Sequence, residues 1–124
     1  MAQDQQPAPR DQSKVVSLNQ AILRRRVNEA ITAALALWAP IQTDDSRRQM
    51  IDLDINVSQI IYGMRRAEIV HCVQDATSGR MSFTAKLLSA GEEFFVFASV
   101  QRVAPLNGMH VIIKRVWREV GTSS

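Results

Sequence analysis

Hydrophobic side chains recur at helical spacing in the first part of this chain and at alternate positions in its second half. Between Ser17 and Pro40 the apolar positions are Leu18, Ile22, Val27, Ala30, Ile31, Ala34 and Trp38. Ser17 followed by Gln20 fits a capping box, in which both side chains bind backbone N–H groups at the start of a helix. Pro40 ends the pattern because the residue before a proline avoids helical backbone angles. The spacing therefore predicts one long helix between Ser17 and Pro40.

Two shorter helices are expected next. The stretch TDDSRRQM begins at Thr43, and either Thr43 or Asp44 can cap the second helix. An aspartate in the first turn also favours the positive end of the helix dipole. The apolar positions of this helix are Met50, Ile51 and Leu53. Asn56 or Ser58 can cap a third helix, which extends to about Arg66.

After Glu68 the hydrophobic period falls to two, which is typical of β-strands. The expected strands are EIVHCV, MSFTAKLL, FFVFASV and MHVIIKRVWREV, and the turn-forming stretches DATSGR, SAGEE and APLNG separate them. Helices followed by a run of strands indicate the α+β class, with N-terminal helices packed on a four-stranded antiparallel sheet. The core residues that we expect are Trp38, Ile60, Phe83, Phe95 and Val111.

The length of 124 residues suits one domain with its own core. Residues 1–14 hold two prolines, four glutamines and almost no large apolar side chain, so we expect a disordered tail over 1–14 and a single α+β domain over 15–121. The single cysteine, Cys72, cannot form a disulfide within the chain, which favours a reducing cytoplasm. No apolar run is long enough to cross a bilayer, so the sequence predicts a cytoplasmic protein with no membrane partner.

The net charge is +3, and 12 of the 15 basic residues are arginines. Arginine binds phosphate and carboxylate groups through a planar fork and stacks on nucleic-acid bases. A bias toward GC-rich codons gives the same excess of arginine. Both explanations stay open, so the arginine content by itself assigns no function.

The motifs of common catalytic and cofactor sites are absent from the sequence. It has no glycine-rich phosphate loop, no CxxC pair, no HExxH and no nucleophile elbow. His71 and Cys72 are neighbours on a strand and point to opposite faces, which excludes a shared metal ion. The carboxylates around Asp45 have Arg47 and Arg48 as ion-pair partners, so a solvated helix explains them without a magnesium site. We expect neither a metal nor a cofactor.

The last strand is the best candidate for a binding surface. His110, Lys114 and Arg118 fall at even positions, so strand alternation predicts that they project from one face. Cations spaced along one face can follow a phosphodiester backbone, and an imidazole among them can stack or transfer a proton. The same cations also suit a half-exposed edge strand, where they prevent aggregation. The pattern leaves both interpretations open.

The order of these segments resembles a family of small bacterial proteins of unknown function. The resemblance extends over about residues 18–119 and consists of the long helix, the segment Thr43–Met50 and the strands GRMSFTAKLL, EEFFVFASV and HVIIKRVWRE. That family is similar to the RelE-like and barnase-like ribonuclease toxins. The family's usual histidine falls at Asp45 in this chain, and its second arginine falls near Gln49.

The resemblance implies a RelE-like fold and an RNA-binding protein, either a metal-independent ribonuclease toxin of a toxin–antitoxin pair or a degenerate form of one. The residues that would bind RNA are Arg47, His110, Lys114, Arg115 and Arg118. An aspartate with an ordinary pKa of about 4 cannot replace a histidine as an acid at neutral pH. Arginines and lysines can still stabilise a cyclising phosphate, so whether the chain is an enzyme stays open and no catalytic residue is assigned.

The alternative function belongs to a different class. The chain would then be a non-catalytic protein-binding module, such as an inhibitor or accessory factor from a mobile genetic element, with the long helix as its interface. Salt-sensitive RNA binding would favour the first function. A stoichiometric complex with a protein partner, without an effect on RNA, would favour the second.

Overall fold

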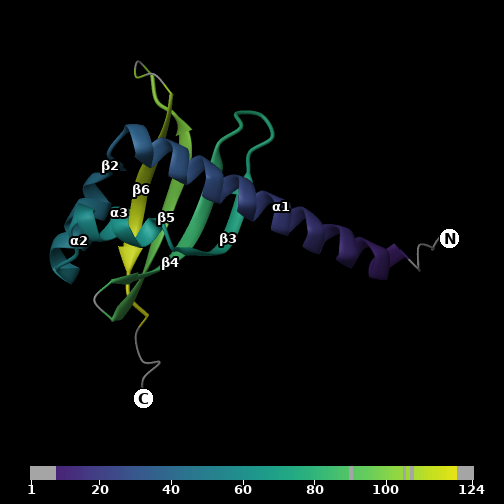
Figure 1. Cartoon of the computed structure of the whole chain (residues 1–124), viewed down its shortest axis with the longest axis horizontal. Helices are drawn as coiled ribbons and strands as arrows, with labels where there is room; N and C mark the ends of the chain where they lie inside the picture. Colours follow the sequence, from purple (N-terminus) through teal and green to yellow (C-terminus); the bar gives the residue numbers. More distant parts are fainter. Residues whose placement is uncertain (1–7, 90, 105, 107, 120–124) are drawn as a thin grey trace.

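A computed structural model describes residues 8–89, 91–104, 106 and 108–119, with their side chains from residue 19 onwards (Figure 1). The helices are α1 (Ala8–Leu37), α2 (Asp44–Leu53) and α3 (Val57–Met64). The strands are β2 (Ile41–Gln42), β3 (Glu68–Gln74), β4 (Met81–Ser89), β5 (Glu92–Arg102) and β6 (Met109–Trp117).

Helix α1 is longer than the sequence predicts. It begins at Ala8, so the expected start at Ser17 and the expected end of the tail at residue 14 both fall inside the helix. Pro9 is compatible with this start because a proline in the first turn removes no helical hydrogen bond. Residues 1–7 of the expected tail lie outside the described residues. The first half of α1 extends beyond the sheet, and its second half crosses the strands (Figure 1).

The caps of the two short helices follow from the sequence. Thr43 is the N-cap of α2, and its side-chain oxygen accepts the N–H of Ser46 at 3.1 Å. Asn56 is the N-cap of α3 and forms a capping box with Gln59, in which each side chain accepts the other residue's backbone N–H at 2.8 Å. Of the alternatives that the sequence leaves open, the structure therefore selects Thr43 and Asn56.

The described residues form a five-stranded sheet in the order β2-β6-β5-β4-β3. Strands β3 to β6 are an antiparallel meander, as the alternating pattern predicts. Strand β2 pairs with β6 in parallel, through Ile41 opposite Ile112 and Gln42 opposite Ile113. The α+β class is confirmed, whereas the expectation of a purely antiparallel four-stranded sheet is wrong. A two-residue strand is too short to produce a hydrophobic period, so the sequence gives no sign of β2.

All three helices lie on one face of the sheet, and the core lies between them (Figure 1). Ile60, Phe83 and Val111 are buried there, as predicted. Phe95 is only half-buried because its neighbour Phe94 faces the helices instead. Trp38 follows the end of α1 and is 42% exposed. The sequence correctly predicts β5 and α1, but it places the side chains of Phe95 and Trp38 in the core, where the structure does not bury them.

Helix α3 packs tightly on β4 through a glycine. A Cβ atom on Gly63 would lie 2.9 Å from the nearest atom of the Leu87 side chain, so a larger residue would force the two elements apart. Gly63 lowers the intrinsic stability of the helix, and this close contact explains why the helix contains it. Among the described helices, α1 included, none has the combination of length and hydropathy that a membrane crossing requires.

Candidate functional site

The last strand does not present the single basic face that its sequence predicts. Lys114 is an additional residue in β6, because Phe97 of β5 pairs with Arg115 whereas Ala98 pairs with Ile113. Such a bulge reverses the alternation of the side chains that follow it. The even positions of β6 therefore do not share one face along the whole strand.

His110 and Lys114 are both held by structural contacts. His110 is buried, and its ring centroid lies 5.1 Å from that of Trp38. Lys114 is half-buried in the bulge, where its carbonyl oxygen accepts the hydroxyl of Thr43 at 3.4 Å. The His110 imidazole is therefore not exposed for contact with a nucleic acid in this structure.

The three predicted arginines have different contacts, and two of them line the same cavity. The Arg118 guanidinium pairs with Glu92 at 2.8 Å and borders a cavity beside the end of α2. Arg47 lies on α2, where its guanidinium is 3.5 Å from the Asp44 carboxylate. Arg115 lies on the side of the sheet opposite the helices. Arg115 and Arg118 nevertheless both line a cavity of about 330 Å³ beside α2, whereas the other three predicted residues are not among its lining residues. The structure therefore brings together two of the five residues predicted to bind RNA, and their binding of RNA stays a prediction.

The face of the sheet opposite the helices, formed by the outward side chains of β3 to β6, is called here the open face. Its centre is aromatic. The rings of Phe95 and Trp117 are stacked with centroids 5.7 Å apart and an interplanar angle of 15°. The Arg115 guanidinium lies 5.1 Å from the centroid of the Trp117 ring, and Phe97 is the cross-strand neighbour of Arg115. Three half-buried aromatic side chains and one arginine thus form a continuous surface across β5 and β6.

Aliphatic side chains extend this surface onto the other two strands. Val73 of β3 is 49% exposed, and Leu88 of β4 is 59% exposed. Both belong to the open face because their strand neighbours Cys72 and Leu87 are buried under the helices. Val73 lies opposite Ser82, and Leu88 lies opposite Glu93, so polar side chains adjoin both exposed aliphatic residues.

The charges of the open face balance. The Lys86 ammonium lies 3.4 Å from the Glu68 carboxylate and 3.9 Å from that of Glu93. Together with Arg115 these residues give two positive and two negative side chains among the described part of the face. The net charge of +3 of the whole chain is therefore not concentrated on its open face.

The segment Thr43–Met50 lies along the edge of the sheet beside β6. Strand β2 covers only the first part of β6, and beyond it the Gln49 side-chain oxygen accepts the N–H of Val116 at 2.7 Å. The Thr43 N–H donates to the carbonyl oxygen of Ile113 at 3.2 Å. These bonds replace hydrogen bonds that a further strand would provide, and they give Gln49 a structural role.

Asp45 does not occupy a cleft. Its carboxylate lies 3.6 Å from the Arg48 guanidinium and is largely exposed in the first turn of α2. Asp44 and Arg47 form an equivalent pair one residue earlier. Both pairs are ordinary solvent-exposed contacts between residues three apart on a helix.

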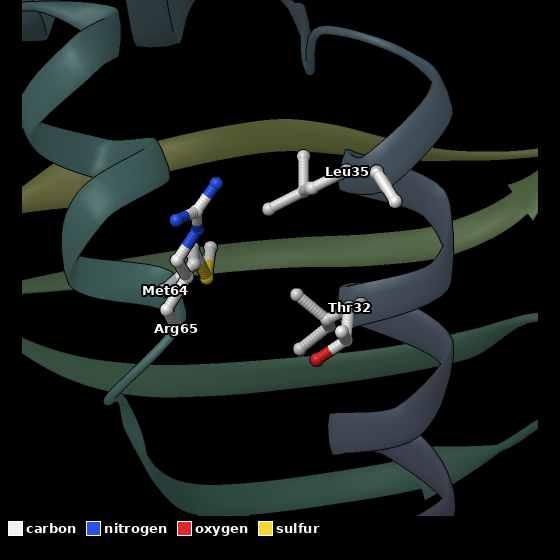
Figure 2. Close-up of a pocket in the computed structure, with 6 residues that line it drawn as sticks. Thr32, Leu35, Met64 and Arg65 are labelled. Carbon is white, nitrogen blue, oxygen red and sulfur yellow. The ribbon is translucent and has the colours of Figure 1, made fainter.

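A groove of about 370 Å³ separates α1 from α3 on the other side of the sheet. Figure 2 shows Leu35 and Thr32 on its α1 wall and Met64 and Arg65 on its α3 wall. The walls are apolar apart from one hydroxyl and one exposed guanidinium. Arg65 is the charged residue among the six that line it.

The titratable groups with perturbed pKa values lie away from the open face. Burial raises the pKa of the Cys72 thiol, and the nearby Arg24 charge partly opposes this rise. A buried thiol with a raised pKa is a poor nucleophile. Among the described residues, no group of three or more His, Cys, Asp or Glu side chains is arranged to hold a metal ion.

The aromatic side chains of the open face are the residues that sequence reasoning missed. The sequence predicts Phe95 as a core residue, whereas the structure leaves it half-buried on the open face. The sequence does show that FFVFASV is apolar at successive positions, so large apolar side chains of this strand fall on both faces of the sheet. Comparison with protein-family models, curated proteins and solved structures found no match to this chain. The resemblance to the ribonuclease toxins therefore stays a prediction.

Proposed function

We propose that this chain is a non-catalytic protein-binding module whose partner binds the open face. The observation that carries the proposal is the Phe95–Trp117 stack with Arg115 above it, on a sheet face that no described helix covers. Tryptophan, aromatic side chains and arginine are the residue types that dominate the energetics of protein interfaces. A rim of ion pairs around an apolar centre, as Glu68 and Lys86 provide, is also typical of such interfaces.

RNA binding on the same face is the second candidate function. The observation that favours it is the Arg115–Trp117 pair, because aromatic rings and guanidinium planes on a sheet can stack unpaired bases. Phosphate contacts also need cations, and RNA affinity depends on the number of phosphates that they neutralise. Lys86 already has two glutamates beside it, so the open face offers few such cations. The balance of charge therefore favours a protein partner.

A catalytic role is not part of the proposal. Arg47 and Arg48 form exposed ion pairs with Asp44 and Asp45, and His110 is buried beside Trp38. In the described part of the chain, these groups do not converge on one cleft. Ribonuclease catalysis needs groups that hold the phosphate and move a proton at the same place.

Affinity capture with matched surface variants tests the proposal. Tagged wild-type protein, Trp117→Ala and Tyr62→Ala are compared, each with and without ribonuclease treatment. Tyr62 is a suitable control because it is also an exposed aromatic residue with an arginine above it, but it lies on α3 (the Arg66 guanidinium is 5.4 Å from its ring centroid). We expect a stoichiometric protein partner that Trp117→Ala loses and that Tyr62→Ala retains, regardless of ribonuclease.

Two results would contradict a protein partner. If the captured protein disappears after ribonuclease treatment, RNA bridges the complex and the second candidate takes its place. The second candidate would also be supported if the wild-type protein binds labelled single-stranded RNA in a salt-dependent way and Trp117→Ala abolishes this binding. If Trp117→Ala retains every partner of the wild-type protein, the open face is not the binding surface.

A further inference from the structure

We infer that the cavity between α2 and the end of β6 is a carboxylate-binding site, which takes an aspartate or glutamate side chain of the protein partner. This inference deepens the proposed function and rests on it, because the cavity shares Arg115 and Trp117 with the open face. Its volume of about 330 Å³ lies at the lower end of the range of small-ligand sites.

Hydrogen-bond donors from three residues line this cavity. Arg115 and Arg118 contribute guanidinium groups, whose planar set of N–H donors matches the two oxygens of a carboxylate. Gln49 contributes the NH₂ group of its amide, because its side-chain oxygen already accepts the N–H of Val116 at 2.7 Å. The cavity is therefore suited to a group that accepts hydrogen bonds.

The charge of the cavity matches a single carboxylate. Two arginines and one aspartate, Asp52, line it, which leaves one net positive charge. A strand of RNA would bring several phosphates to a cavity in which Asp52 repels each of them. One acidic side chain neutralises the cavity, so the balance of charge favours a protein carboxylate over a polyanion.

The contacts within the chain leave the Arg118 guanidinium incompletely bonded. Its Nη2 atom lies 2.8 Å from the Glu92 carboxylate, whereas its Nε atom is shielded from water and has no hydrogen-bond partner in the part of the chain that the structure describes. A buried donor without an acceptor is unfavourable, and few occur in folded proteins. The side chain is still 38% exposed, so a rotation of the guanidinium lets a carboxylate in the cavity accept from Nε.

The remaining walls suit the methylene groups of an acidic side chain. They are formed by Leu53, by Val116 and by the Trp117 ring, which has the Arg115 guanidinium 5.1 Å from its centroid. An apolar surface and two cations thus lie next to each other. A charged head group on a short apolar stem satisfies both.

A titration with propionate tests the site, because propionate carries the carboxylate and the short stem of a glutamate. The Arg118 Nε–H signal and the backbone amide signals of Val116 and Trp117 are followed by NMR, with chloride keeping the ionic strength constant. We expect saturable shifts with a dissociation constant in the millimolar range, of about 1–100 mM. Propionamide, which has the same shape without the charge, should cause no saturable shift.

Matched variants locate the binding. Arg118→Gln should raise the dissociation constant for propionate by at least about fivefold, and Arg118→Lys should raise it less because a lysine keeps the charge but lacks the planar fork. Arg65→Gln, which removes an exposed arginine from the groove between α1 and α3, should leave it unchanged.

A substitution that increases affinity excludes misfolding as the cause. Glu92→Gln removes the carboxylate that competes for Arg118, so it should lower the dissociation constant for propionate. Glu29→Gln makes the same change of net charge at an exposed position of α1 and should have no effect. Equal effects of the two substitutions would show that only the overall charge matters and would overturn the inference.

The outcomes separate this inference from the proposed function. The inference is overturned if propionate causes no saturable shift, if propionamide binds equally well, or if inorganic phosphate binds more tightly than propionate, which would favour a nucleic acid. If Arg118→Gln still captures the protein partner that Trp117→Ala loses, the proposed function stands and the inference falls. If propionate binds but Trp117→Ala retains every partner, the proposed function falls, and the carboxylate does not come from a partner of the open face.

Discussion

The two faces of the sheet have similar side chains but different surroundings. Strand β5 contributes Phe94 to the face under the helices and Phe95 to the open face. Phe94 is fully buried among aliphatic side chains, whereas Phe95 has Trp117 on one side and solvent above it. The residue type is therefore a poor guide to its role in this strand. What separates the two phenylalanines is the layer of helices, which only one of them contacts.

The largest expected effect tests this difference directly. Phe94→Ala should lower the free energy of unfolding by about 3–5 kcal/mol, because it leaves a cavity in a closed core. Phe95→Ala should cost only about 1–2 kcal/mol in dilute protein, because part of the ring is already in water. Denaturant titration of both variants at low concentration measures the two values. Equal costs would show that the open face is as well covered as the core.

A second prediction concerns the hydrogen bond by which Gln49 of α2 contacts the edge strand β6. Gln49→Ala should lower the free energy of unfolding by about 1–3 kcal/mol, because the N–H of Val116 loses its acceptor. Gln49→Glu keeps an oxygen at this place and should recover most of the loss at neutral pH. Arg48→Ala on the exposed side of the same helix should change stability by less than about 0.5 kcal/mol. Identical unfolding midpoints for all three variants would exclude the proposed role of Gln49.

Much of the fold could be predicted because its signals are local. The caps at Thr43 and Asn56, each one of two alternatives that the sequence offers, and the alternation of β4 depend on residues close in sequence, and the structure contains them. Strand β2 could not be predicted because its two residues are defined only by β6, which lies far along the chain. The N-terminal extension of α1 was missed for a different reason. Its composition lacks the apolar residues from which helices are normally predicted.

The candidate site could not be predicted from strand alternation because β6 contains one residue more than its partner strand at the bulge. An uninterrupted β6 would place Lys114 and Arg118 together on one face, as strict alternation predicts. The bulge at Lys114 instead turns Arg115 and Trp117 toward the open face. The bulge lies where β2 ends and where Thr43 contacts the strand, so it is set by tertiary contacts. Hydrophobic period alone does not contain that information.

A third prediction concerns Thr43, which connects the start of α2 with the bulge. Thr43→Ala should lower the free energy of unfolding by about 1 kcal/mol, because it removes the acceptor of the Ser46 N–H. Thr43→Ser retains the hydroxyl and should restore most of that stability. If the bulge depends on this hydroxyl, Thr43→Ala should also change the amide chemical shifts of Arg115 and Trp117. Unchanged shifts there would show that the bulge forms independently of Thr43.

The smallest expected effect on stability concerns Asp75 in the turn between β3 and β4, which belongs to neither face of the sheet. The pKa of the Asp75 carboxyl is lowered, first because the Thr77 N–H donates to it at 2.9 Å and then because the Ser78 hydroxyl donates at 3.0 Å. A carboxyl with a lowered pKa in the folded protein stabilises the fold above its ordinary pKa, and this contribution is lost as the pH falls through the lowered value.

Asp75→Ala should therefore destabilise the protein slightly at about pH 7 and less at about pH 2, because the wild-type carboxyl takes up protons as the pH falls. Denaturant midpoints of the wild-type protein and the variant at both pH values measure the difference. Arg80→Ala should change the pH profile less, because the Arg80 charge is the weakest of the contributions that lower this pKa. A variant that loses the same stability at both pH values would show that Asp75 acts through the shape of the turn and not through its charge. Neither substitution should change the affinity of the open face for its partner, because the turn carries none of the aromatic residues of that face.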